Sequence, residues 1–194
     1  MGTYGYISII AMLCYGFMLL MFLTAKRNKI INSFLVVLTG LLFWTGGSAF
    51  MRAQLWPGCE FWYQVSLLGI LLLPYAYYRF ILAFGGVRNG SAGRIYLVTM
   101  LICFWVNAQF GVFLESPKMI EKRGVQTFVY EITPSIIVFF IPAGLFLIHL
   151  FVILVRICKE NPTMKVQYEP VMMGVLALFL GNAFLGIPFF SGFP

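Results

Sequence analysis

The chain has 194 residues, of which 61% are hydrophobic and 10% charged, and its net charge is +7. Soluble domains carry about 25% charged residues, so a soluble fold of this composition could not cover its own surface. The mean hydropathy of +0.94 excludes a disordered chain, and four cysteines are too few for a disulfide scaffold. The sequence therefore predicts an integral membrane protein.

Long apolar runs follow one another along the chain, each close to the roughly 20 residues that a helix needs to cross the hydrocarbon core. They lack the alternating polarity of barrel strands. We expect an all-α, polytopic membrane helix bundle with six transmembrane helices, N-terminus outside, in a single transmembrane domain over residues 1–194. The predicted spans are residues 6–25, 30–51, 61–84, 95–114, 134–158 and 170–190.

The basic residues indicate the orientation. The first run could be a signal peptide, but its basic residues follow the apolar stretch, so an uncleaved helix is favoured. With the N-terminus outside, four Lys and Arg lie in outer loops: Arg52, Lys118, Lys122 and Arg123. Nine lie in cytoplasmic loops or at the inner ends of the spans, as the positive-inside rule favours: Lys26, Arg27, Lys29, Arg79, Arg88, Arg94, Arg156, Lys159 and Lys165. No loop gathers a basic patch with interleaved aromatics, so we expect the lipid bilayer, and no nucleic acid, as a partner.

The longest predicted loop, residues 115–133, lies on the outer side. Val125, Phe128 and Tyr130 follow Gly124, and this pattern fits an extended or hairpin-like cover over the mouth of the bundle. A flexible polar tether fits equally well. A chain of six spans that starts outside also ends outside, and this one stops at Pro194, shortly after the sixth span. We expect it to be part of a longer protein rather than to end there.

Groups that could perform chemistry are scarce. The sequence has no Asp, its six Glu lie in loops or at span margins, and it has a single His. Ion-coupled transport and metal-dependent lipid transfer commonly use buried or clustered carboxylates. The four cysteines form no C-x-x-C motif. We therefore predict no catalytic constellation, no metal site and no cofactor, and we expect the chain itself not to be an enzyme.

Four neutral amides fall at similar depth in the outer half of the predicted spans: Gln64, Asn107, Gln109 and Asn182. An amide in hydrocarbon needs a hydrogen-bond partner, so these side chains should point into the bundle. They are candidate ligand-binding residues in an outward-facing pocket. Hydrogen bonding between helices, with no ligand, is the alternative and the more common case.

The inner half of the bundle contains candidate signal-relay residues. Pro74 removes a backbone hydrogen bond and should kink the third span, and Tyr75 shares a face with Gln64, eleven residues earlier. His149 follows Pro142 by seven residues and could bind a ligand or respond to pH. The alternatives are that tyrosines of this region are interfacial anchors, and that His149 bonds a carbonyl freed by the proline.

One stretch resembles a known family. The run from Phe61 to Gly69, followed by Leu73-Pro74 and Phe80, resembles the third helix of the seven-helix N-terminal sensor region of bacterial histidine kinases and diguanylate cyclases. Gly181-Asn182 and Pro188 are similar to the end of that region. The resemblance implies a seventh helix and an effector enzyme after Pro194, a homodimer formed through that part, and a place in the bacterial cytoplasmic (inner) membrane.

The function we expect is that of a membrane-embedded sensory module, the input domain of a receptor of the histidine kinase or diguanylate cyclase type. It would bind a small or apolar ligand, either a small molecule or a lipid. Binding of the ligand would shift the population of two helix packings. The main alternative is a small multi-pass transporter or channel component. A membrane enzyme acting on lipid is the third.

Overall fold

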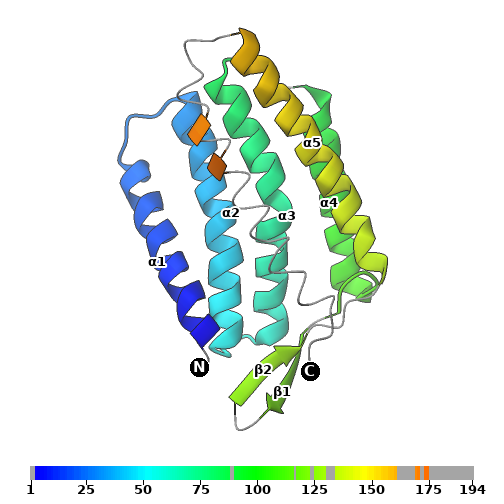
Figure 1. The fold of residues 1–194 in the computed structure, drawn as a ribbon. Coiled ribbons are helices and arrows are strands. Elements are labelled where there is room, and N and C mark those ends of the chain that lie inside the picture. The colour runs from blue at the N-terminus through cyan, green and yellow to red at the C-terminus, as the bar shows by residue number, and fades with distance from the viewer. Residues whose placement is uncertain are drawn as a thin grey trace. The chain divides into compact units, whose positions relative to one another are not determined.

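The computed structural model describes residues 3–87, 90–115, 117–122, 125–129, 134–160, 169–170 and 173–174. In chain order the helices are α1 (Thr3–Leu23), α2 (Lys29–Arg52), α3 (Cys59–Phe84), α4 (Ser91–Phe110) and α5 (Ile137–Glu160) (Figure 1). A 3-10 turn, Pro134–Ile136, precedes α5, and the strands β1 (Lys118–Lys122) and β2 (Val125–Val129) lie between α4 and α5. The sixth predicted span and Asn182 lie outside the described residues, apart from three residues at the start of that span.

The chain divides into two compact units, Met1–Leu147 and Ile148–Pro194. The first holds α1 to α4, the strands and the first part of α5. The second holds the rest of α5.

The five helices in the described part of the chain are long and apolar enough to cross a membrane, which confirms the predicted class of polytopic helix bundle. Their positions along the chain lie close to the first five predicted runs. α4 begins and ends about four residues before the predicted run of 95–114. It stops there because Gly111 adopts a left-handed conformation with φ of 60° and its N–H donates to the Asn107 carbonyl at 2.8 Å. The orientation of the bundle in the membrane stays a prediction.

The predicted outer loop contains a hairpin. β1 and β2 pair antiparallel, with Lys118 opposite Val129 and Lys122 opposite Val125. This confirms the hairpin form and removes the flexible tether as an interpretation of this segment. That the hairpin covers the mouth of the bundle stays a prediction.

Helices α2 and α3 lie backbone against backbone because glycines face the partner helix. A Cβ added to Gly47 would lie 2.6 Å from the Ser66 nitrogen, and one added to Gly69 would collide with the Trp44 nitrogen. The Ser66 hydroxyl donates to the Trp44 carbonyl at 2.9 Å across the same interface. Small residues permit this close approach in membranes, where the association of helices relies on packing and hydrogen bonds.

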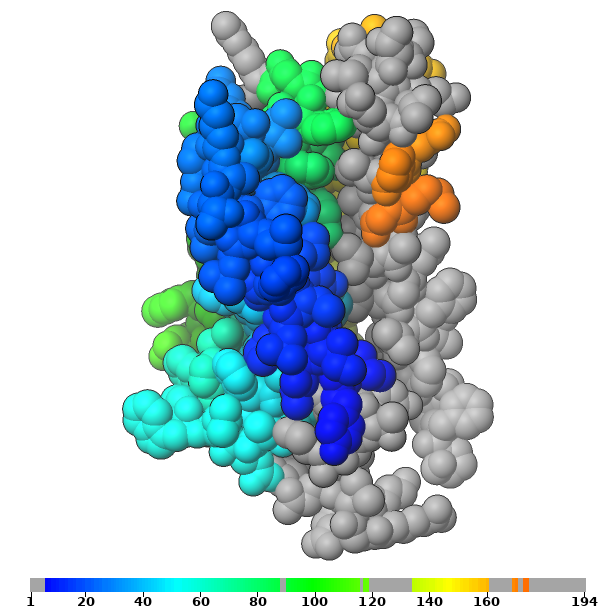
Figure 2. Space-filling model, turned by 90° about the vertical axis from the view of Figure 1, so that its left-hand side faces the viewer, coloured from blue at the N-terminus to red at the C-terminus, as the bar shows by residue number. Residues whose placement is uncertain are grey.

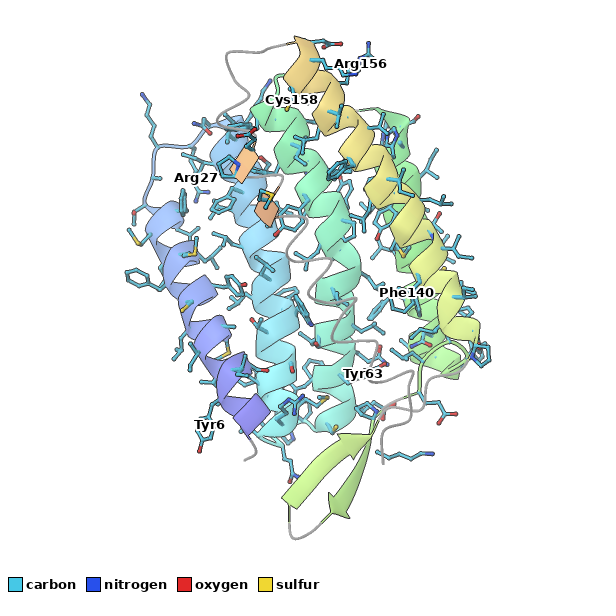
Figure 3. The ribbon with its side chains drawn as sticks, viewed as in Figure 1. Tyr6, Arg27, Tyr63, Phe140, Arg156 and Cys158 are labelled. Carbon is cyan, nitrogen blue, oxygen red and sulfur yellow. The ribbon has the colours of Figure 1, made fainter. Side chains whose placement is uncertain are left out.

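Helix α1 packs on α2 more loosely. Gly46 of α2 faces the Met12 side chain, with 3.5 Å between an added Cβ and the sulfur. The hydroxyls of Ser8 and Ser48 are 3.4 Å apart. Much of α1 is exposed, and its side chains form the blue surface nearest the viewer in Figure 2. Figure 3 shows Tyr6 pointing away from the neighbouring helices. This outer surface suits contact with lipid.

Candidate functional site

The predicted amides occupy different environments. Asn107 is buried, with 1% of its surface exposed. Gln64 is half-buried and follows Tyr63, which Figure 3 labels at the lower part of α3. Gln109 is exposed on the surface of α4. Asn182 lies outside the described residues. Gln64 and Asn107 thus remain candidates for an interior site, and Gln109 is not in the interior of the described part of the bundle.

Asn107 holds the loop that leaves α4. Its Oδ1 accepts hydrogen bonds from the backbone nitrogens of Phe113 and Leu114 at 3.0 and 2.8 Å, and its Nδ2 donates to the Leu114 carbonyl at 3.1 Å. A buried amide with these three bonds is well satisfied. Its observed contacts therefore fix the chain as it turns from α4 toward the hairpin.

Gln64 differs from Asn107 in its hydrogen bonding. Its Oε1 is inaccessible to solvent and has no hydrogen-bond partner among the described residues; the Arg52 Nε, at the end of α2, is in the same state. A buried acceptor without a donor costs about 1–3 kcal/mol. Gln64 therefore keeps an open acceptor that a donor from outside the described residues could fill.

Pro74 lies buried within α3 and has no N–H to donate to the Ile70 carbonyl. The neighbouring Leu71 carbonyl accepts a hydrogen bond from the Tyr96 hydroxyl of α4, at 3.1 Å. A side chain of another helix thus binds the backbone of α3 in the turn that Pro74 weakens. Tyr75, the predicted relay residue, is half-buried beside it.

Three aromatic rings from three helices meet next to this bond, and we call them the aromatic cluster: Tyr78 of α3, Tyr96 of α4 and Phe146 of α5. The rings of Tyr96 and Phe146 stack with centroids 4.2 Å apart and an interplanar angle of 11°. Tyr78 and Phe146 lie 5.2 Å apart at 52°. All three side chains are buried. The cluster therefore joins three helices through side chains.

A glycine of α4 makes room for the cluster. A Cβ on Gly93 would lie 2.5 Å from Cε1 of Tyr78. The Tyr78 hydroxyl also accepts a hydrogen bond from the Gly90 nitrogen at 3.3 Å. The interpretation of this region as interfacial anchors is wrong for Tyr78, because only 3% of it is exposed. Arg79, the next residue, is exposed at the surface.

The other predicted relay residue, His149, is exposed and belongs to the second unit. Its role stays a prediction. No group of His, Cys, Asp and Glu able to hold a metal ion occurs among the described residues. The interactions found among the described residues are thus helix packing and hydrogen bonding.

Tyr96 and Phe146 were not predicted as site residues from the sequence. A usable signal was present: Phe146 follows Pro142 by four residues, and Gly93 precedes Tyr96 by three, so each shares a helix face with a packing or kinking residue. Spacing alone did not reveal that these faces meet beside Pro74.

No curated protein and no solved structure matches the chain. A family model, described as the N-terminal 7TM region of histidine kinase, matches residues 7–193. This range includes the hydrogen bond beside Pro74 and the aromatic cluster. The chain therefore belongs to the family of N-terminal seven-transmembrane regions of histidine kinases.

Proposed function

We propose that the chain receives a signal at the outer half of the membrane and passes it on by changing the packing of α3 against α4 and the first part of α5. The output is the kinase activity, or in a relative of the cyclase type the cyclase activity, of a domain that follows in the same protein. We place it in the bacterial inner membrane, where such a protein would act as a homodimer through its C-terminal part.

The hydrogen bond from Tyr96 to Leu71, in the turn before Pro74, is the observation that carries the proposal. Pro74 leaves the Ile70 carbonyl without its helix donor and favours a bend of α3 in this turn, where the Tyr96 hydroxyl binds the neighbouring Leu71 carbonyl. Tyr96 also stacks on Phe146 of α5. A change in the bend of α3 therefore reaches two other helices through one side chain.

The proposed ligand is small or apolar and carries a hydrogen-bond donor. Its polar contact is the open Oε1 of Gln64, ten residues before Pro74 on the same helix. Gln109 is exposed on α4, where it could meet a ligand entering from the bilayer, and Asn182 is proposed as a further contact. Ligand binding would then shift the population of two packings by its differential affinity for them.

The test uses the complete kinase in lipid vesicles, with autophosphorylation measured with and without 1-decanol, an apolar probe with one hydroxyl donor. Wild type is expected to change its output with decanol. Pro74→Ala should hold a fixed output, high or low, at normal expression, because the helix regains its missing hydrogen bond. Gln64→Leu should keep the basal output and lose the response.

Ser66→Ala is the control, because it removes a hydrogen bond from the α2–α3 interface and should leave the response intact. A wild-type protein indifferent to decanol would contradict the proposed ligand chemistry. A normal decanol response in Pro74→Ala would contradict the proposed route through α3.

A further inference from the structure

The turn between α2 and α3 displays large apolar side chains. Trp56 is 90% exposed, and Leu55 and Phe61 beside it are 45% and 51% exposed. Figure 2 shows the cyan part of the chain, where α2 passes into α3, standing out at the lower left. An exposed tryptophan between two apolar helices needs an explanation, because indole is one of the largest apolar side chains.

Hydrogen bonds fix the backbone of the turn, so the exposed position of Trp56 is defined by the fold. The indole nitrogen of Trp62 donates to the carbonyls of Leu55 and Trp56 at 3.2 and 3.3 Å. The Leu55 nitrogen donates to the Phe50 carbonyl at 3.2 Å. Edge-on contacts with Phe50 and Phe61, at 4.6 and 5.1 Å between ring centroids, fix the Trp62 ring itself. The backbone of the turn is thus bonded to the helices while the Trp56 side chain points outward.

Both helices that meet at this turn are long enough to span the membrane, so the turn lies where the hydrocarbon meets the lipid headgroups. Tryptophan favours this level because its ring is apolar and its N–H can bond to the polar layer. We propose that Leu55, Trp56 and Phe61 form an interfacial anchor that inserts into the boundary between headgroups and acyl chains. The anchor sets the depth of the tightly packed α2–α3 pair in the membrane.

Lipid fits this surface better than a protein partner does. A stable protein interface buries about 800 Å² on each side, whereas a large aromatic side chain buries about 150–250 Å². The side chains of Leu55, Trp56 and Phe61 by themselves are too few for such an interface. The charged neighbours at this end, Arg52 and Glu60, suit the polar layer of the bilayer. The inference is independent of the signalling role proposed above.

Fluorescence quenching tests the anchor in the complete protein, reconstituted in phosphatidylcholine brominated either near the carbonyl end or near the methyl end of the acyl chains. The emission of Trp56 is the difference between wild type and Trp56→Phe, and Trp56→Tyr supplies a second difference should the first variant fold poorly. We expect the shallow bromines to quench this emission about twice as strongly as the deep ones, since interfacial indoles lie at headgroup level.

Trp105, 61% exposed on the side of α4, is the matched control. The difference between wild type and Trp105→Phe should show stronger quenching by the deep bromines than Trp56 does. Emission of Trp56 that iodide quenches from water, and that bromine at either depth leaves unchanged, would overturn the anchor. Protection from iodide and from both bromines would overturn it too, because it would show a protein partner.

Discussion

Helix α3 meets its two neighbours in different ways. Toward α2 it presents small side chains and backbone, with Gly69 against the Trp44 nitrogen and Gly47 of α2 against Ser66. Toward α4 it presents the Leu71 carbonyl, which accepts a hydrogen bond from the Tyr96 hydroxyl. It also presents the Tyr78 ring, which lies against Gly93. Backbones in contact cannot move apart without losing the interface, whereas aromatic rings can change rotamer or stacking.

The two interfaces lie on two faces of the same helix. Ser66, Gly69, Leu73 and Ala76 have helical spacing and lie on or near the side that packs on α2. Leu71 and Tyr78 are seven residues apart and lie on the side of α4. One face of α3 therefore packs rigidly on α2, while the opposite contacts with α4 are made by side chains that can rearrange. We propose that signalling uses the second face.

The largest effect is expected from Gly69→Ala. The new Cβ would collide with the Trp44 nitrogen and lie 2.9 Å from the Gly40 carbonyl oxygen, and backbone cannot yield without separating the helices. Overpacking costs about 1–3 kcal/mol, and we expect the upper end. The measurement is the free energy of unfolding in mixed micelles. Gly144→Ala is the control, since among the described residues no atom outside its own stretch of helix lies within 4 Å of an added Cβ, and it should leave stability unchanged or slightly raised.

Gly93→Ala should cost less, about 1–2 kcal/mol, because its Cβ meets the Tyr78 ring rather than backbone. Truncating that ring should relieve the clash, so Gly93→Ala combined with Tyr78→Leu should be less destabilised than the sum of the two single variants. No side-chain truncation at Trp44 should rescue Gly69→Ala in the same way. Full additivity of the first pair would mean that the α4 interface is as rigid as that of α2.

The smallest effects on stability are expected from two matched hydroxyl deletions, Tyr96→Phe and Ser66→Ala. Each removes one hydrogen bond between a side chain and a carbonyl of the neighbouring helix, at 3.1 and 2.9 Å. Such bonds contribute about 0.6 kcal/mol on average in membranes, so the two variants should unfold alike. Autophosphorylation should change in Tyr96→Phe alone. Equal outputs would remove the functional distinction between the two faces.

The sequence was sufficient to predict the membrane class and the first five helices, because long apolar runs are a local signal. For residues 115–133 it left a hairpin and a flexible tether as equal alternatives, and the structure shows the hairpin. The end of α4 was placed about four residues late, because Phe113 and Leu114 are apolar yet lie in a loop that Asn107 holds by hydrogen bonds. Apolarity predicted a longer helix there than the cap allows.

The candidate site was less predictable, since its contacts join residues far apart in the chain. Pro74 was identified from its own chemistry, but Tyr96 and Phe146 are ordinary aromatics of apolar runs until the helices are assembled. Gln109 and Asn107, two residues apart, lie on different sides of α4, and depth in the membrane gave no information on which side each occupies.

The most direct test measures both faces of α3 at once. The measurement is electron paramagnetic resonance on the complete kinase with its cysteines replaced by serine. One pair of spin labels, at Arg79 of α3 and Asn32 of α2, reports the α3–α2 interface, and a second pair, at Arg79 and Val98 of α4, reports the α3–α4 interface. All three positions are exposed. When the Tyr96→Phe variant is compared with the labelled protein that retains Tyr96, the distance distribution from α3 to α4 should shift or broaden, while that from α3 to α2 stays unchanged. A shift in the distance from α3 to α2, or an altered output with both distributions unchanged, would contradict the account.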